Sequence, residues 1–163
     1  MAPVEHTLNE LITALDEARG SYHKLALLIG PSNSGKTQIL RRVADKLGCS
    51  VLNVNLEFSQ RMLDVPKSRR PKQADRIFRE MVVSPTADTV LLDNLEVLFD
   101  PALQLDPLRL LQIVSRNHTA AASWNGEIHE GLLSYAKPDH PEYKAYRDVD
   151  AKIVRAGSPT PSN

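Results

Sequence analysis

Apolar residues along this chain follow two alternating patterns, short unbroken runs and positions spaced three or four residues apart. The runs KLALLI (24–29) and TVLL (89–92) are unbroken. Such short runs are typical of β-strands that are covered on both faces. The stretch SVLNVNL (50–56) alternates apolar and polar residues, and TAAASW (119–124) is short and mostly apolar. We expect these two stretches to be strands as well.

Between the strands, apolar residues recur at helical spacing. Helices are expected at 7–20, 35–48, 73–83 and 106–116. Thr7 to Glu10 reads T-L-N-E, a capping box that would start the first helix, and Gly20 can end it. Pro85 would break the third helix. The stretch 57–71 shows no clear pattern.

A glycine-containing loop joins the first strand to the second helix. Residues Gly30 to Thr37 satisfy G-x-x-x-x-G-K-[ST], with a strand before and a helix after. In this motif backbone N–H groups and the positive end of the helix face phosphate oxygens. Lys36 would reach the β- and γ-phosphates, and the Thr37 hydroxyl would bind Mg²⁺. The predicted nucleotide-binding residues are Gly30, Pro31, Ser32, Asn33, Ser34, Gly35, Lys36, Thr37 and Gln38.

Acidic residues follow the third strand. Asp93 comes directly after the apolar run, where an acid can hold Mg²⁺ through water, so Thr37 and Asp93 are the predicted metal-binding residues. The alternative is an ordinary acid at a strand end. The next residue is Asn94, where hydrolysing P-loop proteins often carry a glutamate that activates water. Glu96, and Glu57 after the second strand, are the candidate substitutes, although a solvated or structural acid is the favoured interpretation of each.

Polar residues also end the fourth strand. Ser123 and Asn125 lie where AAA+ and related ATPases place a side chain that senses the γ-phosphate, and Asn125 is the favoured residue. The alternative for Asn125-Gly126 is a plain turn. Arg116 is expected at the start of this strand, so it could act only on the nucleotide of a neighbouring subunit. The predicted catalytic residues are Lys36, Asp93, Glu96 and Asn125.

The alternation of strands and helices predicts an α/β fold with a parallel sheet flanked by helices, and ligands bind at the carboxyl ends of such strands. With the phosphate loop, this predicts a P-loop NTPase core of the ASCE/AAA+-like type, in one domain over 1–155 whose N-terminal helix is 1–20. After Gly126 the segments 131–136 and 146–154 favour β-structure, without a helical lid. The tail 156–163 is expected to be disordered.

Composition limits the partners that we expect. Lys plus Arg and Asp plus Glu both number 20, so no global positive field favours nucleic acid. The basic residues Lys67, Arg69, Arg70 and Lys72 could contact DNA or an acidic partner, but a solvated loop is favoured. Cys49 is the only cysteine, which fits a reducing cytoplasm. We expect no signal peptide and no membrane span.

Several stretches together resemble a named family. GPSNSGKT, LLDNLEVLFDPALQLDPLRLL, SRN, SWNG and LSYAKPDHPEY are similar to the small P-loop protein of type 3 BREX phage-defence systems, the BrxF family. The resemblance extends from about Leu25 to Tyr143. It implies a bacterial cytoplasmic protein that acts beside other BREX components, which include a large ATPase, a methyltransferase, a helicase and an alkaline-phosphatase-like protein. The functional positions that it carries over are the phosphate loop and Asp93.

The function expected from these features is ATP and Mg²⁺ binding with slow or partner-stimulated hydrolysis, as a subunit of a BREX system. Only 37 residues follow Gly126, and without a lid a partner would complete the site. A homo-oligomer is compatible with this view. The alternatives are a small-molecule kinase, in which Arg69, Arg70 and Arg76 would mimic a lid, and a scaffold that binds nucleotide without hydrolysing it.

Overall fold

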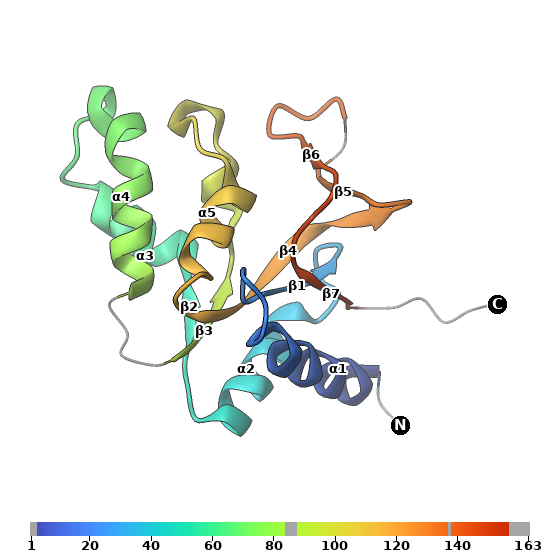
Figure 1. The fold of residues 1–163 in the computed structure, drawn as a ribbon. Coiled ribbons are helices and arrows are strands. Elements are labelled where there is room, and N and C mark those ends of the chain that lie inside the picture. The colour runs from blue at the N-terminus through green and yellow to red at the C-terminus, as the bar shows by residue number, and fades with distance from the viewer. Residues whose placement is uncertain (1–2, 84–87, 137, 157–163) are drawn as a thin grey trace.

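The computed structural model describes residues 3–83, 88–136 and 138–156, which form a mostly parallel sheet covered by helices on both faces (Figure 1). The parallel strands lie in the order β2 (Val51–Asn53), β3 (Thr89–Asp93), β4 (Thr119–His129), β1 (Leu25–Gly30) and β7 (Lys152–Arg155). Antiparallel strands β5 (Leu132–Tyr135) and β6 (Lys144–Tyr146) extend from the distal part of β4. The predicted α/β architecture is confirmed.

Two helices cover one face of the sheet and three cover the other (Figure 1). Helices α1 (Pro3–Ala18) and α2 (Lys36–Leu47) lie on one face, and α3 (Val54–Met62), α4 (Arg70–Val83) and α5 (Pro107–Val114) lie on the other. Strand β1 serves both cores because successive side chains point to opposite faces. Leu25 and Leu27 join the core under α3–α5, whereas Ala26 and Leu28 join the core under α1 and α2. This explains why the sequence of β1 is an unbroken apolar run.

The first helix begins earlier than its capping box predicted. Helix α1 starts at Pro3, which has the φ angle that a first helical position needs. Thr7 therefore lies inside the helix and is buried, so the predicted capping box is wrong. The helix ends at Ala18, two residues before Gly20. Helix α2 matches its prediction, because Gly48 ends it in the left-handed conformation with φ of 71°.

The second strand is shorter than predicted, and a helix replaces its second half. Strand β2 ends at Asn53, whose side-chain oxygen accepts a hydrogen bond of 3.1 Å from the backbone N–H of Leu56. Asparagine is a preferred N-cap residue, so α3 starts at Val54. Glu57 consequently lies on α3 rather than at a strand end, where it pairs with Arg61. The unassigned stretch 57–71 contains the rest of α3 and a 3-10 turn, η1 (Lys67–Arg69).

Other helix predictions differ from the structure by a few residues. Helix α4 begins at Arg70 instead of residue 73, and α5 begins at Pro107 after the N-cap Asp106, close to its prediction. Pro85 lies outside the described residues. Ala156, which we expected in the disordered tail, is buried and donates a backbone hydrogen bond of 2.7 Å to Ile29, while 157–163 lie outside the described residues.

Strand β4 continues through Asn125 and Gly126, so the alternative of a turn at that pair is wrong. Gly126 is paired with Tyr135 of β5, and this pairing keeps the chain extended. The turn lies instead at Glu130 and Gly131, which both have positive φ, as a tight two-residue hairpin requires. The β-rich C-terminal segment is confirmed, although 147–151 separate β6 from β7. No helix follows β4 among the residues that the structure describes.

Gly126→Ala should destabilise the protein by about 3 kcal/mol. A Cβ at this position would overlap the carbonyl oxygen of Ser134 on β5, so the substitution forces the hairpin away from β4. Urea unfolding measures the effect, with Gly20→Ala as the control, because a Cβ there comes no closer than 3.9 Å to the Glu17 oxygen. A Gly126→Ala variant as stable as the wild type would contradict the pairing of β4 with β5.

Candidate functional site

The phosphate loop connects β1 to α2 and takes a conformation suited to binding anions. Asn33 and Gly35 have φ angles of 65° and 88°, which turn successive N–H groups toward a common side. Gly30 leaves no room for a side chain, since a Cβ there would lie 2.6 Å from the Ser34 hydroxyl and 3.0 Å from the Ala156 carbonyl oxygen. Glycine is therefore required at the two positions for different reasons, the positive φ angle at Gly35 and the close packing at Gly30.

Lys36 is held by the loop itself. Its Nζ donates hydrogen bonds to the backbone oxygens of Gly30 (2.7 Å) and Pro31 (2.6 Å) and to the hydroxyl of Ser34 (3.2 Å). The side chain is only 6% exposed. Burial lowers the pKa of Lys36 below its ordinary value, and the negative charges of Asp93 and Glu96 oppose that shift. A buried cation near two carboxylates is thus fixed over the loop, where an anionic ligand would offset the free-energy cost of burying its charge.

Asp93 links the phosphate loop to two strands of the sheet. It is buried at the end of β3, and its two oxygens accept hydrogen bonds from different hydroxyls. Thr37 donates to Oδ2 at 2.7 Å and Ser123, on β4, donates to Oδ1 at 2.6 Å. The predicted pair of Thr37 and Asp93 is therefore in contact. The hydrogen bond from Ser123 helps to orient the Asp93 carboxylate toward Thr37.

Glu96 is held in a fixed position by two amides. It lies in the 3-10 turn η2 (Glu96–Phe99) after β3. The side-chain N–H groups of Asn125 on β4 and Asn55 on α3 donate to its two oxygens at 2.5 Å and 3.0 Å. Asn55 also accepts from the backbone N–H of Val97 at 2.7 Å, so it binds both the side chain and the backbone of η2. The carboxylate of Glu96 is therefore oriented by elements on both of its sides.

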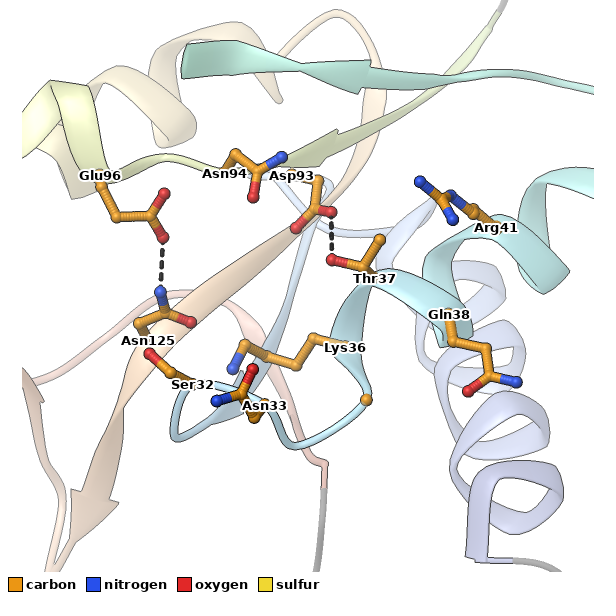
Figure 2. A pocket seen from close by; sticks show the side chains of 11 residues that line it. Ser32, Asn33, Lys36, Thr37, Gln38, Arg41, Asp93, Asn94, Glu96 and Asn125 are labelled. Atoms are coloured by element: carbon orange, nitrogen blue, oxygen red, sulfur yellow. Dashed lines mark hydrogen bonds between the residues drawn. The ribbon is translucent and has the colours of Figure 1, made fainter. Parts of the chain in front are cut away.

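These residues line one cleft of about 710 Å³ at the carboxyl ends of β1 and β3, beside Asn125 within β4 (Figure 2). The lining residues are Ser32, Asn33, Gly35, Lys36, Thr37, Gln38, Arg41, Asp93, Asn94, Glu96 and Asn125. All four predicted catalytic residues are in this set, and so are both predicted metal-binding residues. Gly30, Pro31 and Ser34 lie beneath it and contact the Lys36 ammonium group.

The structure adds two residues that the sequence analysis missed. Arg41 lines the cleft from α2, and Figure 2 shows its guanidinium on the same side as Thr37. It lies four residues after Thr37, a spacing that puts both on one helix face, so the sequence held that signal. Asn55 was missed because residues 50–56 were assigned to a strand. The N-cap residue type at Asn53 was the signal for the helix start.

Other predicted candidates lie elsewhere. Arg116 stands before β4 at the amino end of the sheet, where its guanidinium lies 5.4 Å from the ring centre of Tyr22. The proposed lid residues do not line the cleft. Arg70 donates to the Val65 backbone oxygen, and Arg76 contacts Glu80 and Gln73 on its own helix. Trp124, 1% exposed, is part of the core.

Comparison with known proteins shows a similarity of fold. Neither a protein-family model nor a curated protein matches the chain. Among solved structures, PCH-2 of C. elegans, an AAA+ ATPase, matches with a TM-score of 0.51 and 16% identity over 96% of this chain. The chain spans 43% of the length of PCH-2. This likeness shows that the two proteins share an α/β fold. Within the described residues, no helix has the length and apolar character that a membrane crossing needs.

Proposed function

We propose that this protein binds ATP with Mg²⁺ in the cleft and hydrolyses the nucleotide slowly, as a nucleotide-dependent subunit of a BREX anti-phage system. The observation that carries the proposal is the meeting of Lys36, Thr37 and Asp93 at one edge of the parallel sheet (Figure 2). A buried cation and a hydroxyl at the start of a helix, with a buried carboxylate at the end of a neighbouring strand, are the groups that bind a triphosphate and its metal.

The residues of the cleft fit ATP and Mg²⁺. In the part of the chain that the structure describes, Asp93 is buried and accepts hydrogen bonds from the Thr37 and Ser123 hydroxyls. Oxygen ligands of this kind suit a hard divalent cation. The Lys36 ammonium group, now bound to loop carbonyls, would exchange those bonds for phosphate oxygens. Bound Mg²⁺ would neutralise charge on the phosphates during phosphoryl transfer.

Slow hydrolysis is supported by two features of the site. Asn94, which follows Asp93, is an amide and not an effective general base. No helix after β4 covers the cleft among the described residues, so exclusion of water around the γ-phosphate is expected to be poor. We expect the isolated protein to turn over on the order of once per minute or less, against the roughly 1–100 s⁻¹ typical of kinases. A partner that closes the site should raise this rate.

Glu96 is the proposed base, because its carboxylate lines the cleft and is oriented by Asn125 and Asn55. Glu96→Gln should lower kcat by about 100-fold and leave ATP affinity nearly unchanged, since glutamine keeps the shape but cannot take a proton. Steady-state phosphate release measures kcat, and calorimetry measures affinity. Glu57→Gln is the matched control, because Glu57 lies on α3 outside the cleft.

Three outcomes would change the proposal. Equal kcat in the wild type and Glu96→Gln would show that another group activates water. A wild-type rate equal to that of Lys36→Ala would support the nucleotide-binding scaffold. Transfer of phosphate to a small acceptor would support the kinase alternative.

The BREX assignment rests on the family resemblance of the sequence. Copurification of the neighbouring gene products with the full chain, in the presence and absence of ATP, tests it. Recovery of other BREX components with the wild type but not with Lys36→Ala would support a nucleotide-dependent subunit. No recovery under either condition would refute that role.

A further inference from the structure

Exposed leucines and cations occur together on α3 and on its connection to α4. We define this α3–α4 surface by residues Leu56, Leu63, Lys67, Arg69 and Lys72. In Figure 1, α3 and α4 lie on the side of the molecule away from β5 and β6. None of these residues lines the nucleotide cleft. The surface therefore calls for an explanation of its own.

The leucines on this surface are unusually exposed. Leu56 is 55% exposed and Leu63 is 75% exposed. They lie seven residues apart, and Leu63 keeps a helical conformation at the end of α3, so both belong to one helix face. The opposite face of the same helix is buried through Val54, Phe58 and Met62. Helix α3 thus exposes two leucines that are not needed for the core, and the exposed Ser59 and Gln60 lie between them on the same face.

Within the described residues, no ion pair joins the cations of this surface to an acid. Lys67, Arg69 and Lys72 are exposed, and none forms an ion pair or side-chain hydrogen bond within the described ranges of the chain. The nearby acids Glu57 and Asp75 are paired with Arg61 and Arg79. Asp64 is the remaining exposed acid between α3 and α4. The first turn of α4 contains cations and no acid. Because a positive charge at a helix N-terminus is repelled by the helix dipole, these cations lower the stability of the free protein, and a bound anion would reduce that loss.

We propose that the α3–α4 surface is the docking site for an acidic amphipathic helix of a protein partner. The apolar side of such a helix would cover Leu56 and Leu63, and its carboxylates would face Lys67, Arg69 and Lys72. Nucleic acid fits the surface less well. No exposed aromatic side chain lies between residues 54 and 72 to stack on a base, and phosphate contacts leave the exposed leucines without a role.

The proposal is tested with the full-length protein and a labelled synthetic peptide of glutamate and leucine, with leucines at positions i, i+3, i+4 and i+7. Fluorescence anisotropy should show binding that weakens by about tenfold or more in Lys67→Glu/Arg69→Glu, since attraction becomes repulsion. Leu63→Ser should also weaken it, by about fivefold or more, because the contact loses apolar burial. A peptide of the same composition with scrambled order, which has no apolar face, should bind more weakly than the ordered peptide.

A matched control comes from the other face of the sheet. Lys46→Glu/Leu47→Ser changes one exposed cation and one exposed leucine at the end of α2 and should leave peptide binding unchanged. Circular dichroism checks the fold of each variant. Lys36→Ala should also bind the peptide normally, which separates this inference from the proposed nucleotide binding. The proposal is overturned if the peptide does not bind, if the α3–α4 variants bind it like the wild type, or if DNA of any strandedness binds this surface more tightly.

Discussion

Replacing Lys36 by alanine should weaken ATP binding by about 100-fold or more, because the change removes a charge-assisted contact to the phosphates. Lys36 is the buried cation of the cleft, and its hydrogen bonds to Gly30 and Pro31 hold the ammonium group over the loop. Burial lowers its pKa, so in the free protein the charge is costly and an incoming triphosphate stabilises it. Isothermal titration calorimetry with ATP and Mg²⁺ measures the loss of affinity.

The structure also refines what this substitution does to the fold. The sequence predicts that Lys36 reaches the phosphates of a ligand, but its ammonium group also donates hydrogen bonds to the loop itself. We therefore expect a loosened loop within an otherwise intact fold, which circular dichroism can follow. Lys46→Ala, an exposed lysine on the same helix, serves as the control. Unchanged affinity in Lys36→Ala would remove the basis for nucleotide binding in this cleft.

Asp93→Asn should reduce the affinity gained from Mg²⁺ by about tenfold or more, since it removes a negative charge that would face the metal. The measured quantity is the ratio of ATP affinity in Mg²⁺ to that in excess EDTA. An asparagine can accept through only one oxygen, so one of the hydroxyl contacts from Thr37 and Ser123 must also change. We expect a loss of stability of about 1 kcal/mol from that change.

The matched variant for this experiment is Asp100→Asn. Asp100 caps the 3-10 turn η3 (Pro101–Leu103) outside the cleft, and asparagine can keep that hydrogen bond. It should therefore leave the Mg²⁺ effect on affinity intact. If Asp93→Asn lowers affinity equally in Mg²⁺ and in EDTA, Asp93 has a structural role and the metal assignment is wrong.

The sequence was sufficient where local geometry decides the structure. The phosphate loop is specified by glycines at fixed spacing between a buried strand and an amphipathic helix, so its residues could be named from one short stretch. Asp93 could be placed because a carboxylate that ends an apolar strand must lie at the edge of the sheet. The phosphate loop and the position of Asp93 each depend on a few neighbouring residues. In the structure, the Thr37 hydroxyl lies 2.7 Å from Oδ2 of Asp93.

The sequence was insufficient where distant segments decide the structure. The contact of Asn55 with Glu96 joins residues 41 positions apart, and no local pattern announces it. The extension of β4 depends on pairing with β5, which overrides the turn preference of Asn125 and Gly126. The start of α3 was missed for a different reason, because alternation of apolar residues outweighed the N-cap signal at Asn53.

The contacts of residues 123–126 of β4 provide a way to identify relatives of this protein. Ser123 holds Asp93, Trp124 donates to the Ser134 oxygen beside the Phe99 and Tyr135 rings, and Asn125 holds Glu96. Gly126 leaves the space that the β5 backbone fills. Each of these four consecutive positions is thus constrained by a contact with Asp93, Ser134 or Glu96. A divergent homologue with the same cleft and hairpin should retain S-W-N-G as a fingerprint, even where its helices share little identity with this chain.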